Sequence, residues 1–277
     1  MKFKDNSKNK EYWDKNPMTY KPFNRVELFP KEFSERELKN KMDFDLLNNF
    51  YLKENLYLDK FFRGLNQINF LKDSSVLDIG CGWGSSTKYL SKFSKKVTSI
   101  DISSVAIAGA KKNLSFTDVK NFELFEMDAQ NLSFKDNSYD FIYSWGVIHH
   151  SAEPEKIIKQ LYRVLKNGGE GTIMVYNRNS LRFWLLGFYQ LYLRRQILKG
   201  YTWSNIAKKF TDGYYHKHYV PKQLKNEFLS NGFSEATIKI SHYIGKGKIL
   251  PFININSILG KILLKRFGYF LIIEFKK

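Results

Sequence analysis

The chain of 277 residues is 43% hydrophobic and 26% charged, a composition that allows one large buried core and excludes a disordered protein. Its net charge of +18 is compatible with nucleic acid or an anionic membrane as a partner, but the lysines are spread along the sequence without an arginine-rich block. We therefore interpret the charge as a general compositional bias and expect no nucleic-acid partner.

The single cysteine, Cys81, excludes an internal disulfide framework and favours a reducing compartment. The opening residues, MKFKDNSKNKEYWDKNP, lack the apolar core of a secretory signal. The longest uncharged apolar run, FWLLGFYQLYL at 183–193, is too short to span a membrane. We therefore expect a cytoplasmic protein.

Residues 1–72 have helical, polar and aromatic patterns that are too mixed for an independent domain, and we expect them to form an N-terminal cap. From residue 73 onward, short apolar runs alternate with helical patterns. Strands are predicted at 76–79, 97–101, 122–128, 139–144 and 171–176. Helices are predicted between them at 85–93, 103–114 and 153–169, the last of these ended by Gly168 and Gly169. This alternation predicts an α/β fold in which parallel strands are covered by helices on both faces, a doubly wound sheet.

The pattern changes after residue 177. Residues 178–230 form an aromatic-rich helical insertion, and two apolar runs at 235–244 and 268–277 are typical of final strands. The predicted organisation is therefore a core over 73–177, interrupted by the insertion and completed by strands within 231–277.

A glycine-rich turn follows the first predicted strand in the motif VLDIGCGWG. Gly80, Gly82 and Gly84 let the backbone turn tightly and approach a ligand closely. Such a turn is weak evidence by itself, because nicotinamide dinucleotide enzymes use similar loops. The acids around it are more selective: Asp78 precedes the turn within the strand, and Asp101 ends the next strand, where an acid can bind two ribose hydroxyls.

Asp128 ends the third predicted strand, where a carboxylate can accept a hydrogen bond from an adenine amino group. Taken singly, Asp78 is equally a strand-end cap and Asp101 a helix N-cap. Together the acids suit a ligand that has adenosine and an ammonium group but no pyrophosphate, which describes S-adenosylmethionine. A nicotinamide enzyme, the alternative for this loop, explains neither Asp78 nor Asp128.

Four motifs in order, VLDIGCGWG, SIDIS, EMDAQNLSF and the stretch from YDFIYS to MVYN, resemble the class I S-adenosylmethionine-dependent methyltransferases over about residues 70–177. The resemblance implies a Rossmann-like seven-stranded sheet with an antiparallel last strand, S-adenosylmethionine as cofactor, S-adenosylhomocysteine as product and no metal. A non-catalytic S-adenosylmethionine-binding protein is the alternative to an enzyme. The implied cofactor-binding residues are Asp78, Gly80, Cys81, Gly82, Gly84, Asp101, Ile102, Asp128, Ala129 and Trp145. Cys81 itself is interpreted as a small packing residue rather than a nucleophile.

The methyl acceptor is expected to meet the segment SWGVIHHSAEP, just after the fourth strand. The segment contains two adjacent histidines, His149 and His150. A free imidazole titrates near neutral pH, and small-molecule O-methyltransferases of this family often carry such a pair as general base. The alternative is that one histidine packs structurally or caps the following helix, and the sequence does not decide which would act. We therefore predict O-methylation of a small molecule. The alternative is N- or C-methylation of a lipid or quinone-like acceptor at a membrane surface.

The flanking regions are expected to cover the site. By resemblance, 178–230 forms a helical lid over the substrate; a homodimer contact and docking to a membrane through Arg194, Arg195 and Lys199 are the second and third interpretations. Tyr176 and His216 are expected to contact the substrate, and a metal role for His216 is disfavoured because no Cys or acid cluster accompanies it. The N-terminal Tyr12, Trp13 and Tyr20 are expected to fold over the cofactor, with ordinary aromatic packing as the alternative.

Overall fold

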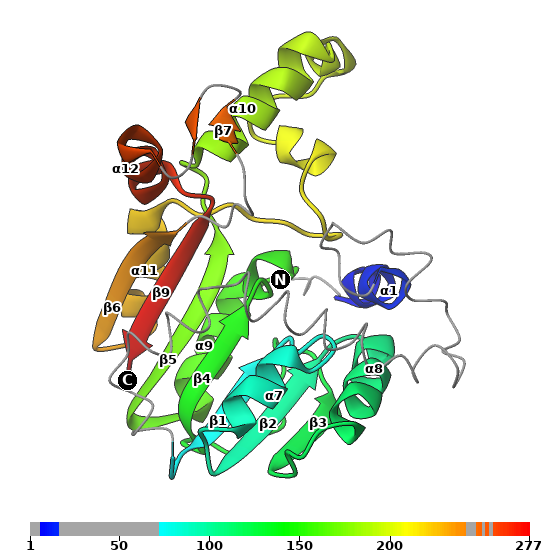
Figure 1. The fold of residues 1–277 in the computed structure, drawn as a ribbon, viewed down its shortest axis with the longest axis vertical. Helices are drawn as coiled ribbons and strands as arrows, with labels where there is room; N and C mark the ends of the chain where they lie inside the picture. The colour runs from blue at the N-terminus through cyan, green and yellow to red at the C-terminus, as the bar shows by residue number, and fades with distance from the viewer. Residues whose placement is uncertain (1–5, 17–71, 242–247, 251–252, 255–256) are drawn as a thin grey trace. The chain divides into compact units, whose positions relative to one another are not determined.

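The computed structural model describes residues 6–16, 72–241, 248–250, 253–254 and 257–277 (Figure 1). Tyr20 and most of the expected cap lie outside these residues. The chain divides into two compact units, an N-terminal unit, Lys10–Ala129, and a C-terminal unit, Met1–Asn9 together with Gln130–Lys277. None of the described helices is both long and apolar enough to cross a membrane.

The N-terminal unit contains three parallel strands, β1 (Ser75–Ile79), β2 (Lys96–Asp101) and β3 (Phe122–Glu126). Val76 pairs with Val97 and Val97 with Phe122, so the three strands end at the same edge. Helix α7 (Ser85–Ser91) packs on β1 and β2, and α8 (Ser104–Ser115) on β2 and β3. Both strands are buried along most of their length, and in β2 the small polar side chains of Thr98 and Ser99 are buried beside Val97 and Ile100.

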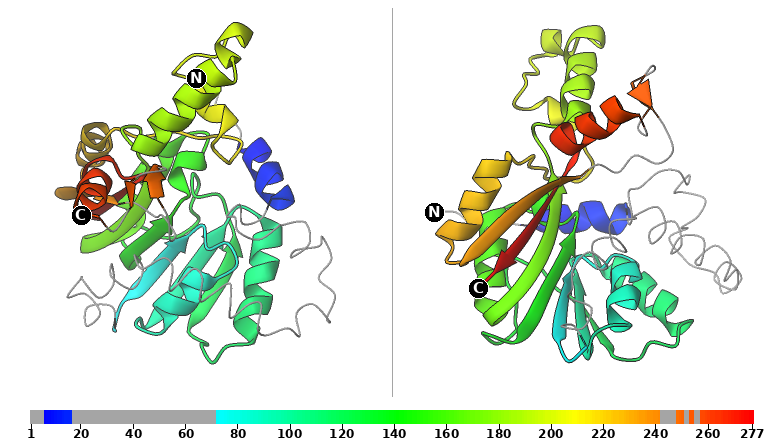
Figure 2. Two further views of the ribbon diagram at one scale, coloured as in Figure 1. Left: turned by 45° about the horizontal axis from the view of Figure 1, so that its top comes forward. Right: turned by 60° about the vertical axis from the view of Figure 1, so that its left-hand side comes forward.

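The C-terminal unit contains β4 (Tyr139–Trp145), β5 (Leu165–Tyr176), β6 (Glu235–Ser241) and β9 (Phe270–Lys276). The last strand in the chain, β9, lies between β5 and β6 and is antiparallel to both, as Figure 2 shows. All seven strands form one sheet in the order β3-β2-β1-β4-β5-β9-β6. The predicted Rossmann-like, seven-stranded sheet with an antiparallel last strand is therefore confirmed.

The remaining elements of the C-terminal unit are helical or short. Helix α9 (Pro154–Val164) packs on β5 and α11 (Pro221–Ser230) on β6. Helix α10 (Leu181–Phe188) continues as one π-helical turn at Tyr189–Leu193. The described residues of this unit also include three 3-10 turns, two short strands and one helix: Ile148–His150, Gln196–Lys199, Ile206–Lys209, β7 (Lys248–Leu250), β8 (Ile253–Asn254) and α12 (Ile258–Phe267).

The prediction for 153–169 was wrong at its C-terminal end. Helix α9 stops at Val164, and Leu165 adopts extended geometry and pairs with Tyr139 as the first residue of β5. Gly168 and Gly169 therefore belong to the strand, where their backbones exchange hydrogen bonds of 3.0 Å with Lys277. Gly168 has a φ of 75°, and the β4–β5 register shifts beside it, as expected for a glycine in a bulge.

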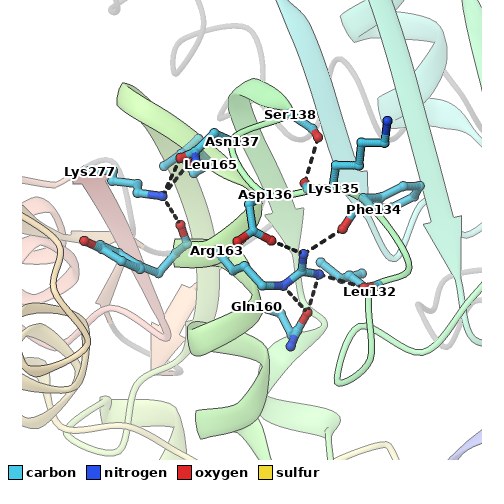
Figure 3. A network of polar contacts seen from close by, with 11 residues as sticks. Leu132, Phe134, Lys135, Asp136, Asn137, Ser138, Gln160, Arg163, Leu165 and Lys277 are labelled. Atoms are coloured by element: carbon cyan, nitrogen blue, oxygen red, sulfur yellow. Dashed lines mark hydrogen bonds and ion pairs between the residues drawn. The ribbon is translucent and has the colours of Figure 1, made fainter.

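The carboxyl end of α9 is held by two basic side chains (Figure 3). Arg163 donates to the carbonyls of Leu132 and Phe134 at 2.7 and 2.6 Å, which fixes the loop before β4. The Nζ of Lys277 donates to the carbonyls of Tyr162 and Leu165 at 2.7 and 2.8 Å. The Tyr162 carbonyl belongs to the last turn of α9, where carbonyls have no partner within the helix, so the lysine supplies a cap that a C′ glycine supplies elsewhere.

Candidate active site

The glycine-rich turn begins where β1 ends. Gly80, Gly82 and Gly84 have φ angles of 75°, 52° and 81°, a region that other residues rarely adopt. The amides of Gly80 and Cys81 both donate to the carbonyl of Ile100, at 2.7 and 3.0 Å, so the turn is tied to the end of β2. A Cβ at Gly84 would lie only 3.1 Å from the side chain of Leu114. The sequence thus requires glycine here for both backbone and packing reasons.

Asp78 is a buried carboxylate directly before this turn. Its Oδ2 accepts hydrogen bonds from the hydroxyls of Ser86 and Thr87 at 2.7 and 3.0 Å. Its Oδ1 is buried and has no hydrogen-bond partner among the described residues. Burial raises the pKa of Asp78 from 3.8 to about 6, although the hydroxyl donors oppose the shift. A buried carboxylate oxygen of this kind is stabilised by a bound cation or donor.

Asp101, the last residue of β2, is half-buried and connects the turn to the next helix. Its Oδ2 accepts from the amide of Gly82 and its Oδ1 from the amide of Ser103, both at 2.9 Å. Burial raises the pKa of this carboxyl, and the two amide donors oppose the shift. The carboxylate is therefore held in a fixed orientation. Ile102 follows it and is half-buried.

Asp128 and Ala129 follow β3, whose end lies beside that of β2. Asp128 is half-buried and Ala129 is buried. Cys81 is buried, and burial with the nearby Asp101 and Asp78 carboxylates raises the pKa of its thiol well above 9.0. The thiol thus stays protonated at neutral pH and is a poor nucleophile, in agreement with the packing interpretation.

Helix α1 (Ser7–Lys15) contacts the same edge of the N-terminal unit. Asp14 accepts a hydrogen bond of 2.7 Å from the hydroxyl of Ser103, and Lys10 forms ion pairs with Asp14 and Glu126 at 3.0 and 2.9 Å. Tyr12 and Trp13 lie on this helix, half-buried, with ring centroids 5.2 Å apart. Sequence reasoning selected these two aromatic residues but missed the polar anchors, because partners 89 residues apart leave no local pattern.

The carboxylates at the carboxyl ends of β1 and β2 suit S-adenosylmethionine as a ligand. The buried Oδ1 of Asp78 can accept a hydrogen bond from an ammonium group. The side-chain-free turn between Asp78 and Asp101 lets a ligand approach the backbone. The individual roles of these residues stay predictions.

A second cluster of functional side chains lies in the C-terminal unit, in the 3-10 turn after β4. Nδ1 of His150 lies 2.9 Å from the carbonyl oxygen of Tyr215. A carbonyl can only accept, so Nδ1 carries the proton and Nε2 is the basic nitrogen of the neutral ring. Nε2 lies 3.9 Å from Oδ1 of Asp212, which also accepts a hydrogen bond of 3.1 Å from the hydroxyl of Tyr176.

His149 lies beside this group with no exposed surface. Its ring centroid is 4.1 Å from those of both His150 and Tyr176. Neither ring nitrogen has a hydrogen-bond partner among the described residues. Burial lowers the pKa of His149 well below 6.5. Burial also lowers the pKa of His150 below 6.5, although Asp212 and the Tyr215 carbonyl act to raise it. Both imidazoles are therefore neutral at pH 7.

Gly213 lets the segment that carries Asp212 and Tyr215 approach His150 closely. Its φ is +86°, and a Cβ at this position would lie 2.3 Å from Nδ1 of His150. The chain passes this close only because position 213 has no side chain. His218 packs 5.5 Å from the ring of Tyr176, and burial lowers its pKa to about 3. His216 is half-buried, and burial and the nearby His150 lower its pKa below 6.5.

The C-terminal unit thus brings together four residues selected from the sequence: His149, His150, Tyr176 and His216. Trp145 is the last residue of β4, with its ring 6.0 Å from that of Phe270. Sequence reasoning assigned no role to Asp212, Gly213 or Tyr215, although the dipeptide Asp-Gly marks a turn. Among the described residues, no group of three or more His, Cys, Asp or Glu side chains is placed to hold a metal ion.

Comparison with known proteins agrees with this geometry. The family described as "Methyltransferase domain" matches residues 77–173. The 2-methyl-6-phytyl-1,4-hydroquinone methyltransferase of Synechocystis is 33% identical over 142 residues, which is 51% of this chain and 43% of the relative. The ubiquinone/menaquinone biosynthesis C-methyltransferase of Wigglesworthia glossinidia brevipalpis is 26% identical over 234 residues, 78% of this chain and 90% of the relative.

The chain spans less than half the length of the first curated relatives that it matches. Among solved structures, a SAM-dependent methyltransferase from Thermotoga maritima shares the fold with a TM-score of 0.52 and 21% identity, over 91% of this chain and 100% of that one. The matched domain, the strand order and the relatives all point the same way. Residues 77–173 therefore match a methyltransferase domain, and the chain has the fold of S-adenosylmethionine-dependent methyltransferases.

Proposed function

We propose that this chain transfers a methyl group from S-adenosylmethionine to an oxygen atom of a small molecule, with the imidazole of His150 as general base. The hydrogen bond between His150 Nδ1 and the Tyr215 carbonyl carries this proposal, because it leaves Nε2 as the proton acceptor. The carboxylate of Asp212, 3.9 Å from Nε2, would stabilise the imidazolium that forms.

The N-terminal unit would hold the cofactor. Asp78 would accept from its ammonium group, Asp101 from its ribose hydroxyls and Asp128 from its adenine amino group. S-adenosylmethionine, when bound, supplies a methyl group on a sulfonium whose leaving group is a neutral thioether. The remaining work of the chain is to position the acceptor and to remove its proton.

His149 would orient the acceptor rather than take its proton. Burial holds its pKa far lower than that of an efficient base at neutral pH. Both of its ring nitrogens lack partners among the described residues, so one can donate to an acceptor oxygen and the other can accept. The rings of Tyr176 and Tyr269, stacked at 4.7 Å, offer an apolar wall beside it.

Methylation of a ring carbon is the second candidate. Two relatives favour it, since one is a hydroquinone methyltransferase and the other a C-methyltransferase of ubiquinone and menaquinone biosynthesis. The same proton removal serves this reaction, because a phenolate is nucleophilic at its ring carbons as well as at oxygen. We expect the aromatic cluster around Tyr176 to accept a flat ring in either case.

The covering segments fit this proposal as well. Residues 178–230 would form a lid over the acceptor, since Asp212, Tyr215 and His216 reach the His150 cluster from that segment. The N-terminal segment would form the cap over the cofactor, since α1 is anchored beside Asp101 through Ser103.

Turnover assays with single substitutions test the proposal. A panel of phenols, catechols and hydroquinones is incubated with S-adenosylmethionine, and release of S-adenosylhomocysteine is measured. We expect His150→Gln to lower turnover by about 10²–10⁴-fold with cofactor affinity unchanged, and His149→Gln to raise KM more than it lowers kcat. NMR of the product distinguishes an O-methyl from a C-methyl group. A double His149→Ala, His150→Ala variant with full turnover would contradict the base mechanism.

The pH profile gives an independent check. Burial lowers the pKa of His150 below 6.5, so its neutral form is populated at lower pH than for a free imidazole. Turnover should rise with pH and reach its plateau before neutrality. Asp212→Asn removes a charge that raises this pKa, and it should move the rise to still lower pH while it weakens catalysis. An unshifted rise would exclude His150 as the titrating group.

A further inference from the structure

Helix α10 and its π-helical turn present apolar side chains to solvent. Three residues spaced four apart, Phe183, Gly187 and Leu191, are buried and attach the helix to the C-terminal unit. The side chains on either side of this row are exposed and almost all apolar: Trp184, Leu185, Phe188, Tyr189, Tyr192 and Leu193. Leu198, in the following turn, is 81% exposed.

Helix α12 adds a second exposed apolar face. Ile258, Leu259 and Ile262 are 81%, 54% and 57% exposed. The end of α12 is joined to the beginning of the α10 segment, because the amide and side chain of Asn177 donate to the carbonyls of Tyr269 and Gly268 at 2.8 and 2.7 Å. Both helices therefore lie beyond the carboxyl end of β5, as Figure 1 also shows.

The sequence segments that contain these helices carry basic residues and no acidic ones. The sequence from 178 to 211 contains seven Lys or Arg residues and no Asp or Glu. From 236 to 273 it contains six Lys or Arg and again no acid. Arg194, Arg195 and Lys199 are exposed next to the apolar side chains of α10, and Lys265 and Arg266 are exposed at the end of α12. An anionic surface complements this distribution.

We propose that this surface docks onto an anionic lipid bilayer. The surface consists of the exposed side chains of α10, its π-turn, Ile197, Leu198 and α12. The apolar and aromatic side chains enter the interface, where aromatic rings are favoured, and the arginines and lysines contact lipid phosphates. A second copy of the chain fits less well, because two such surfaces would bring like charges together. This inference does not depend on the proposed reaction. It would place the His150 cluster near molecules dissolved in the bilayer, because Phe183 of α10 packs on His218, which in turn packs on Tyr176.

Vesicle co-sedimentation of the full chain tests the proposal. The vesicles are equimolar phosphatidylglycerol and phosphatidylcholine, or phosphatidylcholine alone. We expect binding to the anionic vesicles that weakens as salt is raised, and much weaker binding to the neutral ones. Arg194→Gln with Arg195→Gln should weaken binding about 30-fold, and Leu193→Ser with Leu198→Ser by about tenfold or more.

The matched control is Lys111→Gln with Lys120→Gln, which removes the same charge from exposed positions of the N-terminal unit. If this control weakens binding as much as the arginine pair, attraction is only a property of the +18 net charge and the proposal fails. Absence of binding to anionic vesicles at low salt also refutes it. The proposal is also refuted if size exclusion with light scattering detects a dimer that the Leu193→Ser, Leu198→Ser variant does not form. The surface would then be a subunit contact.

Discussion

Replacing Asp78 by asparagine should stabilise the protein in the absence of cofactor. Burial raises the pKa of this carboxyl from 3.8 to about 6. At about 1.4 kcal/mol per pH unit, keeping the carboxylate ionised at pH 7.5 destabilises the folded state by about 3 kcal/mol. The sign follows from the raised value: the folded protein binds a proton more tightly than the unfolded chain, so the wild type gains stability as pH falls from about 6 toward 3.8. The side-chain amide of the Asp78→Asn variant has no charge and lacks this dependence.

Urea unfolding at two pH values measures the effect. We expect Asp78→Asn to raise the free energy of unfolding by up to about 3 kcal/mol at pH 7.5 and by only about 1 kcal/mol at pH 4.5. Asp118→Asn, the same change at an exposed position, is the control for net charge. Calorimetry should show that Asp78→Asn binds S-adenosylmethionine more weakly. A variant that is less stable than wild type at pH 7.5, or whose difference is equal at both pH values, would refute the reasoning.

Two further predictions concern single positions. Asp101→Ala should weaken S-adenosylmethionine binding by about 1.5–3 kcal/mol, measured by calorimetry, and unchanged affinity would remove Asp101 from the cofactor site. Gly213→Ala should lower the melting temperature and turnover together, because its Cβ would lie 2.3 Å from Nδ1 of His150. Gly200→Ala is the matched control, since its φ of +78° is similar but no atom lies within 4 Å of a Cβ there. Equal melting temperatures for the two alanine variants would show that the contact with His150 relaxes without strain.

Most strands were predictable because each contains β-branched or aromatic residues and lies between polar turns. Helix α12 was not predicted, since its residues, ILGKILLKRF, are apolar in a pattern that a buried strand shares. The end of α9 was misplaced because the glycine pair, a strong helix stop, instead serves a bulge in β5. The sequence pattern predicted the right type of element wherever either the helical or the strand periodicity of apolar residues was clear.

The candidate site was predictable only where its residues lie at or just after strand ends. Asp78 and Asp101 lie at the carboxyl ends of β1 and β2, and His150 follows β4, so their position along the sequence locates them in the fold. Asp212 and Tyr215 come to His150 from a segment about 65 residues later, and the contact depends on the missing side chain of Gly213. The anchoring of α1 by Asp14 spans a still longer separation. Neither of these long-range contacts produces a periodic pattern in the sequence.

The place of β9 has a consequence for the order of folding during synthesis. Strand β6 is made before the strand that separates it from β5, so it has no neighbour in the sheet until 270–276 follow. Until then the hydrogen-bonding edge of β5 that β9 later covers is open to other chains, a state in which strands associate wrongly. A chain stopped before residue 270 should therefore aggregate rather than form a smaller sheet, and chaperones would meet this protein with that edge exposed.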